Sequence, residues 1–338
     1  MPHKPFPGTA DLVHHQTCPF CDSHRLTSLG TPVEHESTPL NYHQCNRCRL
    51  IFMNPRPNQA WYNDLYQNEF WEVKKEKKTR GAAKFQVIKE GLWAEKLIHF
   101  LDRMDFVTRN PAPKILEIGC AFGVIGKLVA EHYGGESHGV EPSDSARQFA
   151  QDITGVNMFC ETMDDVIDSQ EDSVFDLVIF SHVLENITRP DEALAAVHRL
   201  LKPNGILLID TPNNFCRRSW HIHHPYCFTL PALKALLSKS GFELEHHKTW
   251  SRPKFLASPV YLTVGAVKSD SISCFFKEEP LLNQVHRMVG YCAFNFLCRG
   301  PLKRINTGGA RRMWRLNANH RIRTKEIFKS AKAMGRDV

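Results

Sequence analysis

The sequence of 338 residues has no long apolar run. A helix that spans a membrane needs roughly 18 or more consecutive apolar residues. The nearest candidate is MVGYCAFNFLC at residues 288–298, which lies between Arg287 and Arg299. We interpret this stretch as a buried helix, with peripheral contact to a membrane surface as the open alternative. The sequence therefore predicts no transmembrane segment.

The beginning of the chain, MPHKPFPGTADLVHH, has no apolar segment of signal-peptide length, so we expect a cytoplasmic protein. In a reducing compartment the 11 cysteines are expected to be metal ligands or buried thiols, and not a disulfide framework. The sequence has no internal repeat and no low-complexity tract, and 42% of its residues are hydrophobic. This composition excludes fibrous and wholly disordered proteins.

A strong overall charge is also missing, because the net charge of +7 is only mildly basic for this length. From Arg299 to the end, however, 12 Lys or Arg residues stand against two acids, Glu326 and Asp337. Such a basic tail can contact phosphate, RNA or an anionic membrane. The alternative is a solvated helical tail that its charge keeps soluble.

Two cysteine pairs are present near the start of the chain. CPFC supplies Cys18 and Cys21, and CNRC supplies Cys45 and Cys48. Each pair fits a tight turn, and four thiolates match the tetrahedral preference of zinc, with iron as a competitor. Four protein ligands leave no open coordination position, which catalytic zinc requires. The spacing therefore predicts a zinc ribbon with a structural metal.

The chain divides into four expected segments: a zinc ribbon at 1–58, a helical connector at 59–110, an α/β domain at 111–268 and a basic helical extension at 269–338. In the third segment short apolar strands alternate with amphipathic helices. We expect strands at 114–119, 137–141, 156–160, 174–180, 206–210, 242–250 and 260–267. This alternation predicts a parallel, doubly wound sheet.

The loop after the first of these strands reads EIGCAFG. Ligands of a doubly wound sheet bind beyond the carboxyl ends of its strands. Ala121 stands where the dinucleotide fingerprint G-x-G-x-x-G requires its second glycine, which argues against NAD or FAD. Glu117 ends the first strand and would repel a phosphate but attract a cation, and Glu141 ends the second strand, where a carboxylate can bind ribose hydroxyls. A ligand with a ribose, a positive charge and no phosphate is S-adenosylmethionine.

Five motifs in order resemble the class I S-adenosylmethionine-dependent methyltransferases over about residues 84–268. They are ILEIGCAFG, HGVEPS, FDLVIFSHVLENI, LLKPNGILLIDTPN and GFELE. The resemblance implies a seven-stranded Rossmann-like sheet and S-adenosylmethionine as the methyl donor. The segment CNRCRLIFMNPRPNQAWYNDLY resembles an amino-terminal module that is fused to many bacterial methyltransferases.

The resemblance also implies which residues contact the cofactor. Glu117, Gly119 and Gly123 would surround the methionyl part, Glu141 the ribose, and Glu161 and Thr162 the adenine. The further expected contacts are Cys120, Ala121, Phe122, Pro142, Ser181 and His182. For Glu161, Thr162 and Ser181 the alternative is a polar loop residue or a helix cap. Cys120 has no base beside it in sequence, so we do not expect a nucleophile there.

Three histidines are candidates for taking a proton from the methyl acceptor: His182 in SHVLEN, and His223 and His224 in WHIHHPYCFT. Neutral histidine is well matched to this task near pH 7. His224 with PYCFT resembles a His-x-x-x-aromatic-Ser/Thr element of the family. In sugar C-methyltransferases the similar element carries a Tyr and a Glu, where this chain has His221 and His223. Structural roles remain open: His224 in capping the next helix and His182 in packing under the cofactor.

We therefore expect an enzyme that transfers a methyl group to oxygen or carbon of a small-molecule or sugar-linked acceptor. One alternative is an RNA methyltransferase that uses the zinc ribbon and the basic tail to bind RNA. Another is a non-catalytic scaffold that keeps the fold. The sequence carries no signal for the acceptor's identity or for the oligomeric state.

Overall fold

A computed structural model describes residues 5–35, 38–69, 82–214, 219–251 and 259–269, together with residues 326, 327 and 329. The apolar stretch 288–298 and nearly all of the basic tail lie outside the described residues. Within the described part of the chain, no helix combines the length and the apolar character that a membrane crossing requires.

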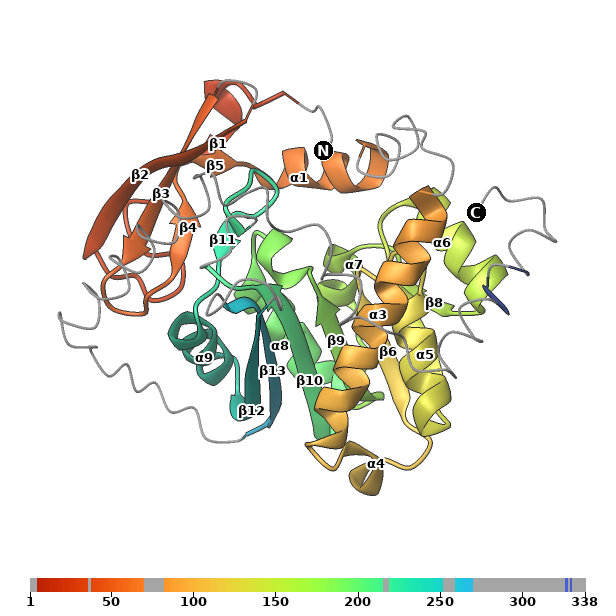
Figure 1. The fold of residues 1–338 in the computed structure, drawn as a ribbon. Coiled ribbons are helices and arrows are strands. Elements are labelled where there is room, and N and C mark those ends of the chain that lie inside the picture. The colour runs from red at the N-terminus through yellow and green to blue at the C-terminus, as the bar shows by residue number, and fades with distance from the viewer. Residues whose placement is uncertain are drawn as a thin grey trace, which may run out of the picture.

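The centre of the molecule is a seven-stranded sheet in the described residues, with strand order β12-β13-β10-β9-β6-β7-β8 (Figure 1). Its strands are β6 (Lys114–Ile118), β7 (Glu136–Val140), β8 (Asn157–Cys160), β9 (Phe175–Ser181), β10 (Leu201–Pro212), β12 (Phe242–Ser251) and β13 (Pro259–Lys268). All seven expected strands are therefore present, with ends that differ by a few residues.

The sheet is mixed and not only parallel as the alternation predicted, because β13 runs antiparallel to both β10 and β12. Only residues 252–258 connect β12 to β13. A parallel pair needs a crossover of a dozen or more residues, so this short connection forces an antiparallel return. β13 thereby enters the sheet between β12 and β10.

Helices cover both faces of the sheet. The helices are α3 (Ala82–Asp102), α4 (Phe106–Arg109), α5 (Val124–Tyr133), α6 (Asp144–Phe149), α7 (Met163–Asp168), α8 (Pro190–Leu200) and α9 (Leu230–Lys239). Because successive strand residues point to opposite faces, Ile115 joins a core with α3 and α5, while Leu116 joins a second core with α8 and α9. In Figure 1, α3 crosses in front of the sheet.

The amino-terminal residues form a separate antiparallel sheet of order β11-β4-β3-β2. Its strands are β2 (Leu26–His35), β3 (Thr38–Cys45), β4 (Ile51–Met53) and β11 (Tyr226–Cys227), and β1 (Leu12–Val13) pairs with β5 (Arg56–Pro57) nearby. β11 comes from the histidine-rich segment, where the sequence predicted no strand. This strand joins the amino-terminal sheet to the rest of the molecule (Figure 1).

The two parts also share a core. Phe20 and Leu50 of the amino-terminal part pack in the same buried cluster as Phe228 and Leu233 near α9. The ring of Phe20 lies 5.1 Å from the ring of Tyr226. The amino-terminal part is thus packed into the central domain over a continuous apolar contact.

A helical segment follows the amino-terminal sheet, as the sequence predicted. It consists of α1 (Gln59–Asp64) and a π-helical turn (Leu65–Glu69). The side chain of Asn58 caps α1 by accepting a hydrogen bond from the Trp61 backbone N–H at 3.0 Å. In Figure 1 this segment lies beyond the end of the central sheet at which β11 is found.

Candidate active site

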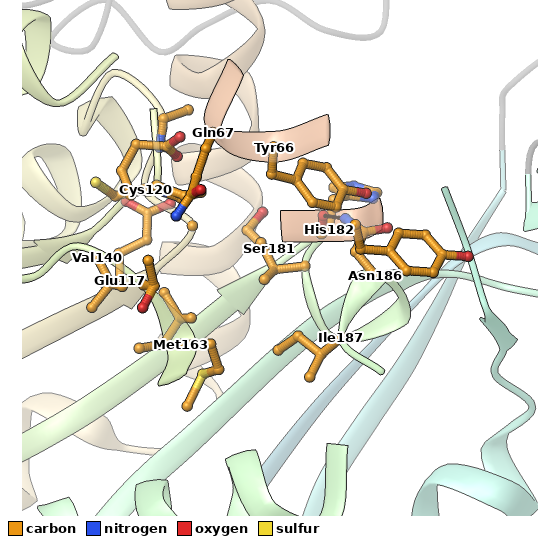
Figure 2. Close-up of a pocket in the computed structure, with 18 of the residues that line it drawn as sticks. Tyr66, Gln67, Glu117, Cys120, Val140, Met163, Ser181, His182, Asn186 and Ile187 are labelled. Atoms are coloured by element: carbon orange, nitrogen blue, oxygen red, sulfur yellow. Dashed lines mark hydrogen bonds between the residues drawn. The ribbon is translucent and has the colours of Figure 1, made fainter. Parts of the chain in front are cut away.

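A pocket of about 240 Å³ opens beyond the carboxyl ends of β6, β7 and β9. The loop after β6 and the start of α7 form one side, and α3 and the segment 59–69 close it from the other. Figure 2 shows Glu117 and Cys120 toward one end of this pocket, and His182 and Asn186 toward the other. The pocket therefore has the position in which α/β sheets bind their ligands.

The loop after β6 turns sharply at two glycines. Gly119 and Gly123 have φ angles of 67° and 71°, in the left-handed region that favours glycine. A Cβ atom at Gly119 would lie 2.5 Å from a methyl group of Val183. Ala121 also has a positive φ, 51°, and its N–H donates to Glu141 at 2.9 Å. The loop thus brings backbone close to the floor of the pocket.

Buried carboxylates surround the loop. Glu117 accepts a hydrogen bond from the Gly126 N–H at 2.8 Å, and Glu141 accepts one from the Ser143 N–H at 3.1 Å. Burial, and then the nearby charge of Glu90, raises the pKa of Glu117 well above its ordinary value. A bound cation would relieve this repulsion, so the donor set fits S-adenosylmethionine and does not fit a phosphate.

Glu90 was not identified from the sequence. It lies on α3, is 2% exposed and accepts a hydrogen bond from the Val124 N–H at 3.4 Å. Its position in an ordinary amphipathic helix carries no motif. The available signal in the sequence was an acid in register with the apolar residues of that helix.

Most of the expected cofactor residues line this pocket, although their roles remain predictions. Those that do are Glu117, Gly119, Cys120, Ala121, Glu141, Pro142, Thr162, Ser181 and His182. Thr162 also caps α7, where it accepts a hydrogen bond from the Asp165 N–H at 3.2 Å. Thr162 therefore lines the pocket, where a cofactor contact is expected, and also caps a helix, which was the alternative.

Three expected residues are not among the lining residues. The Phe122 ring stacks on Phe149 with ring centroids 4.3 Å apart. Gly123 precedes the first turn of α5. Glu161 is exposed and lies 3.4 Å from the guanidinium of Arg147.

His182 is the candidate base that lines the pocket. It has a left-handed φ of 59°, and its backbone N–H donates to the Asp210 carbonyl at 2.7 Å. The imidazole lies between two carboxylates: Nδ1 is 3.6 Å from Glu185 and Nε2 is 3.5 Å from Asp210. Trp93 packs on the ring with centroids 4.3 Å apart. A strained backbone and two flanking acids hold this side chain in place.

His223 and His224 are not among the residues that line the pocket. The Nδ1 atom of His224 lies 3.1 Å from the Ser219 carbonyl, and Nδ1 of His221 accepts from the His223 N–H at 3.1 Å. Burial lowers the pKa of His223 to about 2. These contacts stay within the loop that leads to β11.

Polar atoms at the end of β9 remain unsatisfied. Within the described residues, Ser181 Oγ, His182 Nε2, Glu185 Oε1 and Asn186 Oδ1 are buried and make no hydrogen bond. Buried polar groups are normally paired. Since three of these four residues line the pocket, their unpaired atoms are available to a polar ligand or to water there.

The segment 59–69 contributes a wall that the sequence did not predict. Five of its residues face the pocket: Gln59, Tyr62, Asn63, Tyr66 and Gln67. Their spacing of three and four residues is that of one helical face. That spacing was the available signal, but the polar residues in it gave no reason to expect burial against the central domain.

The four amino-terminal cysteines come together as predicted. Their Sγ atoms all lie within 4.8 Å of one another, and the Phe20 N–H donates to Cys18 Sγ at 3.4 Å. Zinc with bonds of about 2.3 Å to four sulfurs places those sulfurs roughly 3.8 Å apart. The four thiols of Cys18, Cys21, Cys45 and Cys48 therefore fit a closed tetrahedral metal site.

Comparisons with known proteins agree with this geometry. Residues 89–247 match the family model described as "Methyltransferase domain". A ubiquinone biosynthesis O-methyltransferase of Actinobacillus pleuropneumoniae is 27% identical over 131 residues, 35% of this chain and 56% of that protein. The enzyme of the same name from Aeromonas salmonicida is 30% identical over 39% of this chain and 60% of that protein.

A solved structure, described as a putative S-adenosylmethionine dependent methyltransferase from Listeria monocytogenes, covers 53% of this chain and 99% of that one. Its identity is 20% and its TM-score 0.43. The chain spans 56% to 63% of the length of the first two curated relatives that it matches. The central part of the molecule is a methyltransferase domain. This similarity extends over residues 89–247, somewhat less than half of the chain.

Proposed function

We propose that this protein transfers a methyl group from S-adenosylmethionine to a hydroxyl oxygen of a small-molecule acceptor. The carrying observation is that the carboxylate-lined loop after β6 and the side chain of His182 line one continuous pocket. The bound cofactor would supply a methyl group on a positively charged sulfur.

The cofactor end of the pocket consists of Glu117, Gly119 and Glu141. Glu141 is held by the backbone N–H groups of Ala121 and Ser143, which orients its carboxylate for the ribose hydroxyls. A bound cation would stabilise the ionised form of Glu117, so this residue favours the cationic methionyl group over any anionic competitor. These residues bind and orient, which is the main requirement of an in-line methyl transfer.

The acceptor end of the pocket is marked by His182. As the acceptor oxygen attacks, the new O–C bond replaces the S–C bond and the hydroxyl proton must leave. The imidazole of His182 would take that proton, and the carboxylates of Glu185 and Asp210, 3.6 Å and 3.5 Å away, would stabilise the imidazolium. The sequence left a catalytic and a packing role open for His182, and the proposal chooses the catalytic one.

The choice of oxygen follows the names of the relatives, which are called O-methyltransferases. Methyl transfer to carbon was the sequence's other expectation and is an alternative outcome of the test. The basic tail, on which an RNA acceptor would depend, lies outside the described residues.

Cofactor binding is the first test. Calorimetry should detect binding of S-adenosylhomocysteine, and Glu141→Ala should weaken it about tenfold or more because hydrogen bonds to a charged group are lost. Glu171→Ala, at an exposed position outside the pocket, is the matched control. Wild-type protein that does not bind S-adenosylhomocysteine would contradict the proposal.

Turnover is the second test. Labelled S-adenosylmethionine, a metabolite extract and mass spectrometry should identify a methylated product. His182→Asn keeps a residue that tolerates a left-handed φ and should lower the rate about 100-fold or more, with the affinity for S-adenosylhomocysteine retained. His224→Asn should leave most of the rate. Equal rates for His182→Asn and wild type would remove His182 from the mechanism.

A further inference from the structure

The segment 59–69 presents a row of carboxamides to the pocket. Gln59, Asn63 and Gln67 follow one another at intervals of four residues, and all three line the cavity. At 1.5 Å per residue the row is about 12 Å long. Figure 2 shows Gln67 and Tyr66 on the same helical segment, with Gln67 toward Cys120 and Tyr66 toward His182.

Neighbouring side chains orient this row. Gln59 Nε2 donates to Asn63 Oδ1 at 2.6 Å, and Asn63 Nδ2 donates to Asp164 Oδ2 at 3.5 Å. The helix itself is anchored by Tyr62, whose hydroxyl donates to the Ile222 carbonyl at 2.8 Å. A similar bond of 3.3 Å joins Tyr66 to the His223 carbonyl. The carboxamides of Gln59 and Asn63 are therefore held in position before any ligand binds, and Gln67 continues the row on the same helical face.

A carboxamide carries both donors and an acceptor, so it matches a hydroxyl group, which also does both. A row of three, with the Tyr66 ring beside it, offers partners to several hydroxyls in sequence. A single phenolic hydroxyl would use only a small part of it. The row is thus suited to an uncharged group with hydroxyls spread along its length.

The cations that line the pocket do not favour an anionic group. Among the described lining residues they are Lys89 and Arg189. Arg189 is bound to Asp164 and to Glu192, each at 2.6 Å, and the Lys89 ammonium lies 4.1 Å from the centre of the Trp93 ring. A phosphate or carboxylate would also face the carboxylates of the cofactor end.

We propose that the segment 59–69 recognises a glycosyl or polyol group of the acceptor, with Asn63 and Gln67 as specificity-determining residues. This inference rests on the proposed function, because it concerns the same pocket. It makes the cysteine-bearing amino-terminal part a contributor to substrate selection, since the segment continues directly from that part.

Ligand-observed NMR can test the inference without knowledge of the full acceptor. The full-length protein, loaded with S-adenosylhomocysteine, is mixed with three probes: a set of methyl hexopyranosides, catechol and a sugar phosphate. The double variant Asn63→Leu/Gln67→Leu removes two carboxamides. Asn68→Leu is the matched control, because Asn68 is exposed in the same segment and does not line the pocket.

Saturation transfer to at least one hexoside is expected in the wild type and in Asn68→Leu, with about tenfold weaker binding in the double variant. Hexosides that do not bind the wild type, or that bind the double variant equally well, would overturn the inference. A sugar phosphate or catechol that binds more tightly than every hexoside, and equally well to the double variant, would also overturn it. Calorimetric affinity for S-adenosylhomocysteine should be the same in all three proteins. A wild-type protein that does not bind S-adenosylhomocysteine would contradict the proposed function. A wild-type protein that binds S-adenosylhomocysteine but no hexoside would contradict this inference alone.

Discussion

At the scale of single residues, Asp210 connects the pocket to the interior of the sheet. Its carboxylate pairs with the ammonium of Lys96, and both side chains are almost fully buried. It also accepts a hydrogen bond from the Thr263 hydroxyl at 2.5 Å and lies 3.5 Å from His182 Nε2. Burial lowers the pKa of Lys96, while the charge of Asp210 opposes this shift. Each charge of the pair compensates the other, so His182 faces a carboxylate that is already partly neutralised.

Loss of Lys96 should therefore destabilise the fold. Lys96→Met would leave Asp210 buried without its counter-charge, and we expect a loss of about 3 to 5 kcal/mol of unfolding free energy. Lys127→Met is the control, because Lys127 pairs with Glu131 at 3.0 Å on the surface and should cost under about 1 kcal/mol. Urea unfolding measures both values. Similar losses of unfolding free energy in the two variants would show that the buried pair stabilises the fold no more than the surface pair does.

At the scale of elements, the loop from Ser219 to β11 holds two neutral histidines, the buried His223 and the half-buried His221. Burial, and then the neighbouring His224, lowers the pKa of His221 to about 3, and burial lowers that of His223 to about 2. In the unfolded chain both would titrate near 6.5. The unfolded state therefore binds more protons than the folded state between these values, and stability must fall as the pH falls below about 6.5.

The loop should thus make the protein sensitive to acid. At pH 5 each of the two histidines should cost about 2 kcal/mol relative to pH 7.5. His223→Asn should remove about half of this loss of unfolding free energy, because one of the two histidines is gone. His247→Asn, at an exposed position, should leave the loss unchanged. Urea unfolding at both pH values gives the comparison, and metal release at low pH affects all three proteins alike. An equal pH dependence in His223→Asn and wild type would refute the assignment.

At the scale of the whole molecule, the cysteine cluster belongs to the main core. Cys18, Cys45 and Cys48 lie in one buried cluster with strands β9 and β10 and helix α9. The pairing of β4 with β11 and a bond of 3.1 Å from Lys239 to the Phe20 carbonyl add polar contacts across the same boundary. Such a continuous core predicts that both parts unfold together.

Metal analysis and heat unfolding test this expectation. The purified protein should contain about one zinc ion per chain. Chelation, or Cys45→Ser, should lower the midpoint of a single transition that far-ultraviolet circular dichroism and tryptophan fluorescence report at the same temperature. Cys160→Ser, outside the cluster, is the control. Two separate transitions, of which only one responds to chelation, would contradict the shared core.

Local sequence patterns were enough for much of this molecule. The cysteine spacing predicted a cluster whose four sulfurs do meet. The expected ends of two neighbouring strands placed Gly119 and Glu141 at one edge of the sheet, and both residues line the pocket there. These features depend on residues close together in sequence, where backbone conformation and spacing set the geometry. The seven strands were predictable for the same reason.

Contacts between distant segments were decided only by the folded chain. Glu90 reaches the pocket because α3 packs across the sheet, and Gln67 reaches it because β4 pairs with β11 and brings the segment 59–69 over the cavity. His182, directly after β9, lines the pocket, while His224, in the loop after β10, does not. Such outcomes follow from the free energy of burying many distant side chains together, and no single stretch of the sequence contains that information.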